Sequence, residues 1–211
     1  GVCCETRSGM VNDIAMLNRI CEARGIWFAL DAVSALGVES GFCSCPALAM
    51  ATGSSGKALA GVPGIAILLL NPRFPRSVSE VQPKILQLEP LLSAREMPGM
   101  VRNTMSSLLL AALESSCRSI LELGQDHYRR RLLALKDAVR LCLADFGVKA
   151  LAGSDSPIVT AFHRPEPEVW RSWLRSLDEK GVEIYHRVCY LEQRNLFEIA
   201  AMGDWQEEFH R

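Results

Sequence analysis

Two short apolar stretches constrain the fold of this chain more than any other feature. The first, "IWFAL", covers residues 26–30 and leads to Asp31; the second, "IAILLL", covers residues 65–70 and ends at Asn-Pro. Both are apolar at every position, which is typical of interior strands covered by helices on both faces. Between them we expect a third short strand that ends near Thr52. The pattern predicts an α/β layer.

Helical periodicity surrounds these strands. Residues 13–24 place Ile14, Leu17, Ile20 and Cys21 on one face, and Gly25 provides a stop. The second half changes character, because two long helical patterns there precede a mixture of strands and one helix. A proline-rich and serine-rich connection is expected at 72–98, helices at 104–123, 126–146 and 166–181, and strands at 157–163, 182–188 and 196–203. Within 126–146, six apolar side chains are spaced for one buried stripe: Leu132, Leu135, Val139, Cys142, Leu143 and Phe146. The second half therefore predicts an α+β unit.

Composition excludes several function classes. The 211 residues carry 23 basic and 24 acidic side chains, so the formal net charge of -1 favours neither nucleic acid nor an anionic membrane as a partner. The longest apolar run is far shorter than a membrane span. The first residues, "GVCCETRSG", lack the features of a signal peptide and do not begin with Met, so we expect the natural protein to begin further upstream.

Cysteine usage points to a reducing compartment. The eight cysteines lie in a long chain without secretory features, so free thiols and a cytoplasmic location are expected rather than a disulfide framework. Cys43 and Cys45 form a C-x-C pair, but no C-x-x-C or H-x-x-x-H partner completes a zinc pattern. We therefore expect no metal site.

One acid and one lysine follow neighbouring predicted strands. Asp31 ends the first strand, and Lys57 lies in the loop "GSSGKALAGVPG" after the next one. Ligands of open α/β sheets bind outside the carboxyl ends of the strands. A desolvated lysine attacks carbonyl carbon, and an aspartate can hold a pyridine nitrogen protonated, which is the pair that pyridoxal phosphate needs. Spacing alone leaves open a role in solubility or capping.

Three motifs in register carry a resemblance. "CCETRSGMVND", "DAVSALG" and "SSGKALAGVPG" are similar to the class V aminotransferases of the fold-type I pyridoxal phosphate enzymes, with the 2-aminoethylphosphonate:pyruvate transaminase branch nearest. The likeness continues through "RNTMSS", "SPIVTAF", "VEIYHRV" and "FEIAAMG". It implies that residues 1–100 form the C-terminal part of the large mixed-sheet domain with the cofactor lysine. Residues 101–211 would then form connecting helices and a small α+β C-terminal domain.

The resemblance also implies roles for individual residues. Lys57 matches the lysine that forms the Schiff base and moves the substrate proton, and Asp31 matches the partner of the pyridinium nitrogen. Val33 would pack on one face of the cofactor ring, and Thr6 would place a hydroxyl beside it. Thr104 matches a threonine that reaches the cofactor phosphate of the neighbouring subunit, so a homodimer is implied.

Departures from the family concern the surroundings of the lysine. Gly56 stands where the family usually has Asn or Gln, so a hydrogen-bond donor is missing. Glu198 stands where an arginine usually grips the substrate's carboxylate or phosphonate, so we expect it to repel an anionic substrate. Arg187 and Arg194 are candidate replacements. The N-terminal portion with the phosphate-binding turn is not in this chain.

The implied function is a pyridoxal-phosphate-dependent aminotransferase. It would move an amino group from a small amine, such as 2-aminoethylphosphonate or an amino acid, to a keto acid such as pyruvate or glyoxylate. An alternative is a truncated or catalytically lapsed aminotransferase-like domain that acts as a folding or dimerisation partner. A third hypothesis is an unrelated α/β binding domain.

Overall fold

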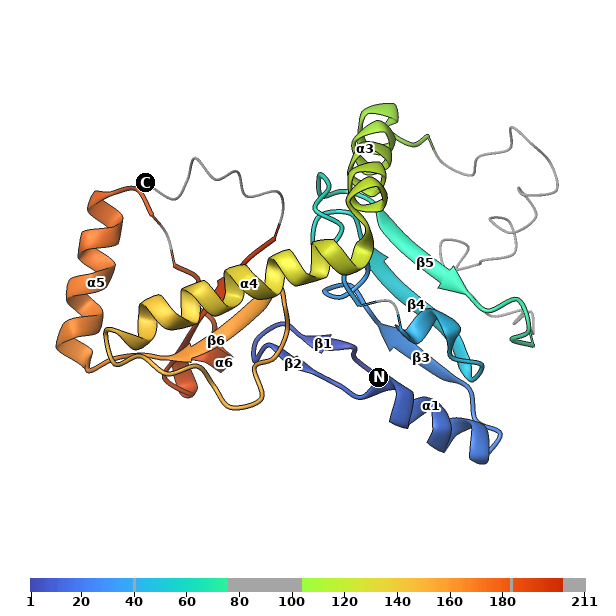
Figure 1. Ribbon diagram of the computed structural model, residues 1–211, viewed down its shortest axis with the longest axis horizontal. Helices are drawn as coiled ribbons and strands as arrows, with labels where there is room; N and C mark the ends of the chain where they lie inside the picture. The colour runs from blue at the N-terminus through green and yellow to red at the C-terminus, as the bar shows by residue number, and fades with distance from the viewer. Residues whose placement is uncertain (40, 76–103, 183, 203–211) are drawn as a thin grey trace.

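A computed structural model describes residues 1–39, 41–75, 104–182 and 184–202. The chain forms two regions joined by one long helix (Figure 1). In chain order the elements are β1 (Cys4–Glu5), β2 (Met10–Val11), α1 (Ile14–Ala23), β3 (Phe28–Asp31), the 3-10 helix η1 (Gly41–Ser44), β4 (Leu48–Ser54), β5 (Ala66–Leu70), α3 (Ser107–Leu123), α4 (Gln125–Ala144), β6 (Val159–His163), α5 (Pro167–Glu179), α6 (Cys189–Gln193) and β7 (Leu196–Ala200).

The first region is built on a mixed sheet of order β3-β4-β5. β3 and β4 are parallel, with Asp31 opposite Thr52, and β5 returns antiparallel to β4. Residues 1–3 extend the sheet at the free edge of β3, because Asp31 N–H donates to Gly1 O and Cys3 N–H donates to Asp31 O, each at 2.8 Å. The predicted α/β layer with three strands is confirmed. The expectation that residues 65–70 form an interior strand is wrong, because among the described residues β5 is an edge of this sheet and Ala66, Leu68 and Leu69 are exposed.

Helix α1 follows the expected sequence signals closely. Asp13 caps it by accepting a hydrogen bond from Met16 N at 2.8 Å, and the chain leaves it through Gly25 at φ +63°. Ile14 and Cys21 are buried against the sheet region, as part of its apolar core. The periodicity thus predicted the helix and most of its buried face, but the prediction for Ile20 was wrong, because that side chain is exposed.

The second region packs a two-stranded antiparallel sheet, β6-β7, against α5. Its centre is aromatic: the ring centroids of Phe162 and Phe197 lie 5.4 Å apart, and those of Phe197 and Trp170 lie 5.0 Å apart. Both phenylalanines are fully buried. Apolar side chains from both strands and α5 therefore close a core separate from that of the first sheet.

The strand predicted at 182–188 is wrong for most of its described length. Only Tyr185 forms an isolated bridge, to Glu198 in β7. The next carbonyl, that of His186, accepts a hydrogen bond from Arg164 Nη2 at 2.9 Å, and the His186 ring bonds back to Ile184 O. Arg164 Nε also donates to Leu196 O at 2.8 Å, and this β7 carbonyl is the one that a longer ladder would need.

Helix α4 joins the two regions (Figure 1). It begins at Gly124, whose φ of +85° lets the chain turn sharply out of α3. Leu132 is buried, but Cys142 and Phe146 at the predicted end of the stripe are exposed. The first half of α4 packs against the sheet region, and in its second half Val139 and Leu143 pack against the second core. Phe146 lies past the end of the helix and contacts the edge of Trp173, with ring centroids 5.7 Å apart.

The connection predicted at 72–98 and the predicted boundary at residue 100 lie outside the described residues, apart from residues 72–75. Within the described ranges, none of the helices has the length and apolar content needed to cross a membrane.

Candidate active site

The parallel pairing of β3 and β4 brings Asp31 and the Lys57 loop to one edge of the sheet. Asp31 is the last residue of β3, and the next amide, of Ala32, donates to Thr52 O at 3.0 Å. β4 continues to Ser54, and Lys57 follows three residues later. Because parallel strands share their carboxyl edge, a side chain from each strand end can face the same space.

A buried serine closes the base of the Lys57 loop. Ser55 Oγ donates to Val62 O at 2.7 Å and accepts from Ile65 N at 3.1 Å, and the Ser55 side chain has no solvent exposure. Ser55 O also accepts from Gly61 N at 2.9 Å. The residues between them are therefore held as a compact loop rather than a flexible tether.

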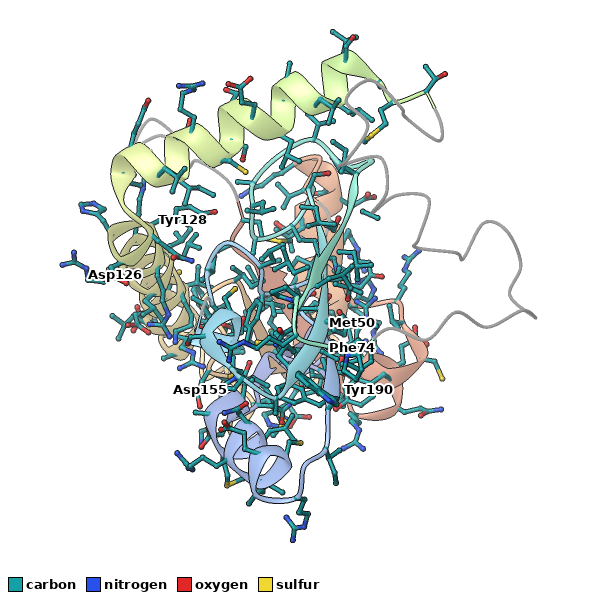
Figure 2. All side chains as sticks on the ribbon, turned by 90° about the vertical axis from the view of Figure 1, so that its right-hand side faces the viewer. Met50, Phe74, Asp126, Tyr128, Asp155 and Tyr190 are labelled. Carbon is teal, nitrogen blue, oxygen red and sulfur yellow. The ribbon has the colours of Figure 1, made fainter. Side chains whose placement is uncertain are left out.

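Helices α3 and α4 hold the same loop from outside. Ser116 of α3 donates its hydroxyl to Leu59 O, and Tyr128 of α4 donates to Ala58 O at 3.2 Å. Tyr128 is buried in the first turns of α4, whereas Asp126 beside it is exposed (Figure 2). The second half of the chain thus sets the position of the loop that carries Lys57.

Steric crowding in this loop explains why position 56 is a glycine. A Cβ built there would lie 2.7 Å from the Cα of Pro63 and 2.6 Å from its ring. Contacts below 3.0 Å with backbone require the chain to shift. The Asn or Gln that the family usually has at this position does not fit against Pro63 in this loop.

Lys57 ends in a short chain of hydroxyl groups. Its Nζ donates to Ser34 Oγ at 3.0 Å, and Ser34 Oγ lies 2.7 Å from Thr6 Oγ1. Lys57 and Thr6 are half-buried, and Ser34 is buried. The structure therefore links Lys57 and Thr6, which were both predicted from the sequence as site residues, through Ser34, which was not.

Ser34 lies in the motif "DAVSALG" three residues after Asp31. Here the chain turns tightly, since the amides of Ala35 and Leu36 both donate to Ala32 O at 2.8 Å. The sequence signal for Ser34 was a polar residue among small apolar ones, in a turn that follows a strand. It indicates a hydroxyl but not its direction, which depends on that turn.

Asp31 and Val33 lie at the start of this turn. Val33 N–H donates to Asp31 Oδ1 at 2.9 Å, and the Asp31 carboxylate is exposed while Val33 is half-buried. Thr104 lies just before α3 and is exposed. Among the described residues, no hydrogen bond joins Thr104 to the group formed by Lys57, Ser34 and Thr6.

Glu198 is paired with a residue that sequence reasoning missed. Its Oε1 lies 2.8 Å from Arg7 Nη1, although 191 positions separate the two residues. Arg7 Nη2 also donates to Tyr185 OH at 3.2 Å. Arg7 is the middle residue of "ETRSG", a motif in which the resemblance implied a role for Thr6 alone. The expected unopposed carboxylate is therefore balanced by a guanidinium.

Burial and nearby positive charges shift the pKa of Glu198 in opposite directions. The side chain is only 7% exposed, and its Oε2 is buried without a hydrogen-bond partner among the described residues. Burial raises the pKa of this carboxyl above its ordinary value, and the positive charges of Arg7 and Lys57 offset part of that rise. The positive charges of Lys57 and Arg7 thus both lower the pKa of the same carboxylate.

The two arginines considered as replacements for the anion clamp have other surroundings. The Arg194 guanidinium lies over the Tyr190 ring, 4.9 Å from its centroid. Arg187 lines a cavity of about 550 Å³ beside α5, together with Leu174 and His186. Within the part of the chain that the structure describes, no group of three or more His, Cys, Asp or Glu side chains could hold a metal ion.

Comparisons with known proteins were made against families, curated sequences and solved structures. No family model matches the chain. It is 24% identical over 207 residues to the 2-aminoethylphosphonate–pyruvate transaminase of Paraburkholderia phymatum, covering 94% of this chain and 55% of that protein. The transaminase of the same name from Pseudomonas aeruginosa strain UCBPP-PA14 is 25% identical over 209 residues, covering 95% and 55%. The chain spans about half the length of these curated relatives.

Solved structures show the fold. The alanine–glyoxylate aminotransferase of Nostoc sp. superposes with a TM-score of 0.85 at 20% identity, covering 96% of this chain and 55% of that one. The pyridoxamine-pyruvate aminotransferase of Mesorhizobium loti gives a TM-score of 0.77 at 21% identity, covering 96% and 54%. The expected fold-type I architecture is confirmed, over about half the length of these neighbours.

Proposed function

We propose that this chain, which resembles class V aminotransferases over nearly its whole length, is the lysine-bearing part of a pyridoxal-phosphate-dependent aminotransferase. The observation that carries the proposal is the position of Lys57. Its amine is held by Ser34 in a rigid loop, at the sheet edge that Asp31 also reaches. A lysine kept merely for solubility needs none of these contacts.

The residues present fit the cofactor. Lys57 would hold it covalently, and the exposed Asp31 carboxylate would pair with its pyridine nitrogen. Asp31 uses Oδ1 for the Val33 amide, which fixes the carboxylate, while Oδ2 can accept another hydrogen bond. Val33 and Thr6 would lie beside the ring. When bound, the cofactor supplies an electron-withdrawing ring that stabilises negative charge at the carbon next to the reacting nitrogen.

We assign the proton transfer to Lys57. Its Nζ, once released from the cofactor, removes the proton from the substrate carbon that bears the amine. Ser34 Oγ and Thr6 Oγ1 fix the lysine, because Ser34 can accept from Nζ while its own hydrogen points to Thr6. Lys57 is therefore the catalytic residue of the proposal, and the two hydroxyls position it.

The proposed reaction moves an amino group from a small amine to a keto acid. 2-Aminoethylphosphonate or an amino acid is the proposed donor, and pyruvate or glyoxylate the acceptor, in line with the names of the relatives. We also propose a homodimer in which the exposed Thr104 faces the cofactor phosphate of the other subunit.

Borohydride reduction tests the proposal. The purified protein is mixed with pyridoxal phosphate, reduced and digested, and peptide mass spectrometry locates the phosphopyridoxyl group. We expect it on Lys57, with loss of this product in Lys57→Arg and full retention in the control Lys149→Arg, at an exposed lysine. Modification elsewhere, or none, would contradict the proposal. The lapsed-domain alternative predicts no modification in a folded protein.

A further inference from the structure

We propose that Arg7 binds the anionic group of the substrate and that Glu198 and Tyr185 position its guanidinium. The proposal rests on the proposed aminotransferase function and deepens it, because it names the residue that selects an anionic substrate. The anion is a carboxylate or a phosphonate, which an arginine recognises with the same paired N–H donors.

The guanidinium is held on two sides. Nη1 donates to Glu198 Oε1 at 2.8 Å, and Nη2 donates to Tyr185 OH at 3.2 Å. The Cζ of Arg7 also lies 4.8 Å from the centroid of the Tyr185 ring. Glu198 and Tyr185 are themselves fixed, because Glu198 lies in β7 and its amide donates to Tyr185 O at 3.1 Å. A long side chain from the β1–β2 turn is therefore anchored to a strand of the other region.

Exposure decides which partner an incoming anion meets. The Arg7 side chain is 33% exposed, whereas the Glu198 side chain is only 7% exposed. A guanidinium has five N–H donors, and the two contacts use only two of them. An anion that approaches from solvent therefore meets donors of Arg7 that no described residue uses, rather than the carboxylate. The sequence predicted that Glu198 would repel an anionic substrate, whereas in this proposal Arg7 attracts it.

Arg7 is also close to the lysine along the chain of hydroxyls. Thr6, its neighbour in sequence, bonds to Ser34, and Ser34 accepts from Lys57 Nζ. Arg7 and Lys57 both lower the pKa of Glu198 through their charge. The ion pair to Glu198 and the hydroxyl chain to Lys57 start at adjacent residues, Arg7 and Thr6, so we place the substrate's anionic group at Arg7 and its reacting carbon at Lys57.

Binding of small probes tests this proposal without turnover. Propionate and methylphosphonate are titrated into the purified protein by NMR, with and without added pyridoxal phosphate, and propionamide is the neutral control. We expect Arg7→Gln to weaken binding of at least one anion by about tenfold or more, since a hydrogen bond to a charged group is lost. Propionamide binding should not change. The matched control is Arg118→Gln, at an exposed arginine ion-paired on α3.

The pattern between anions identifies the preferred group. A loss confined to propionate indicates a carboxylate, and a loss confined to methylphosphonate indicates a phosphonate. Arg7→Lys keeps the charge but not the fork, so its affinity should lie between wild type and Arg7→Gln. Equal anion affinity in wild type and Arg7→Gln would overturn the proposal. If Arg7-dependent binding persists while Lys57 takes no phosphopyridoxyl group, the proposed function fails and the anion site stands.

Exchanging the charges of residues 7 and 198 separates two roles of Arg7, anion binding and the ion pair between the two regions. The double variant Arg7→Glu with Glu198→Arg can restore an ion pair between the two regions, but it presents a carboxylate at the exposed position. We expect thermal stability nearer to wild type than in Arg7→Glu alone, without recovery of anion binding. Anion binding at the wild-type level in the exchanged protein would overturn the assignment to Arg7.

Discussion

The amine of Lys57 donates a hydrogen bond to Ser34 Oγ at 3.0 Å, across the gap between the ends of two parallel strands. Ser34 belongs to the turn after β3 and Lys57 to the loop after β4. The bond therefore links the two strand ends that carry the proposed cofactor contacts. Its removal should affect the lysine more than the fold.

Ser34→Ala tests this link. The variant loses the bonds to both Lys57 and Thr6, so the lysine is less well placed. We expect the rate of borohydride-fixed modification of Lys57 by pyridoxal phosphate to fall about tenfold, with a loss of about 1 kcal/mol in unfolding free energy. The control is Ser44→Ala, at an exposed serine. An unchanged modification rate would show that Ser34 does not position Lys57.

Ser55→Ala should loosen the loop itself. The substitution leaves Val62 O and Ile65 N without the partner that Ser55 Oγ supplies inside the protein. We expect a loss of about 2–4 kcal/mol in the free energy of urea unfolding, because buried backbone groups lose hydrogen bonds. The neighbouring Ser54→Ala removes only a 3.4 Å contact to Gly56 N and should cost under about 1 kcal/mol. Equal effects would contradict this account.

Gly56→Asn tests whether the departure from the family at this position is steric. The new Cβ would meet the Cα of Pro63, which no side-chain change at 63 can relieve. We expect a loss of about 1–3 kcal/mol in unfolding free energy, measured in urea. Gly41→Ala is the matched control, because a Cβ at that position would have no atom of the described residues within 4 Å, apart from its chain neighbours. A fully stable Gly56→Asn protein would show that the loop can open.

Glu198 should make stability fall as pH rises. Its pKa in the folded protein is raised, mainly by burial, so the folded state binds more protons than the unfolded state between the ordinary value of 4.5 and the raised value. Unfolding free energy then decreases as pH increases through that window. We expect Glu198→Gln to flatten this slope, as measured by urea unfolding from pH 4.5 to 7. An unchanged slope would assign it to other groups.

The aromatic core of the second region predicts a large effect at Phe197. The residue is fully buried between Phe162 and Trp170, so Phe197→Ala should cost about 3–5 kcal/mol of unfolding free energy. Phe146→Ala, at a side chain that is 65% exposed, should cost about 1 kcal/mol or less. Thermal unfolding of both variants checks the difference. Similar midpoints would show that the β6-β7 core contributes little.

Local patterns were sufficient for much of the fold. Apolar runs predicted the strands of the first sheet, and caps and periodicity predicted α1, because these signals depend on neighbouring residues. The strand at 182–188 failed because Arg164, outside that segment, takes the Leu196 carbonyl of β7 that the ladder would need. In the α4 stripe, Val139 and Leu143 pack against the second core as predicted, but Cys142 and Phe146 are exposed. Periodicity shows which side chains align, not what the helix meets.

The sequence by itself determined that Asp31 and Lys57 follow neighbouring strands, and parallel pairing then places them at one edge of the sheet. Their roles stay predictions until the cofactor is tested. Only the tertiary structure decided what surrounds them. Ser34 reaches Lys57 through the shape of a turn, and Arg7 meets Glu198 across 191 positions. Spacing along a chain sets strand ends, whereas contacts between distant side chains depend on how separate elements pack.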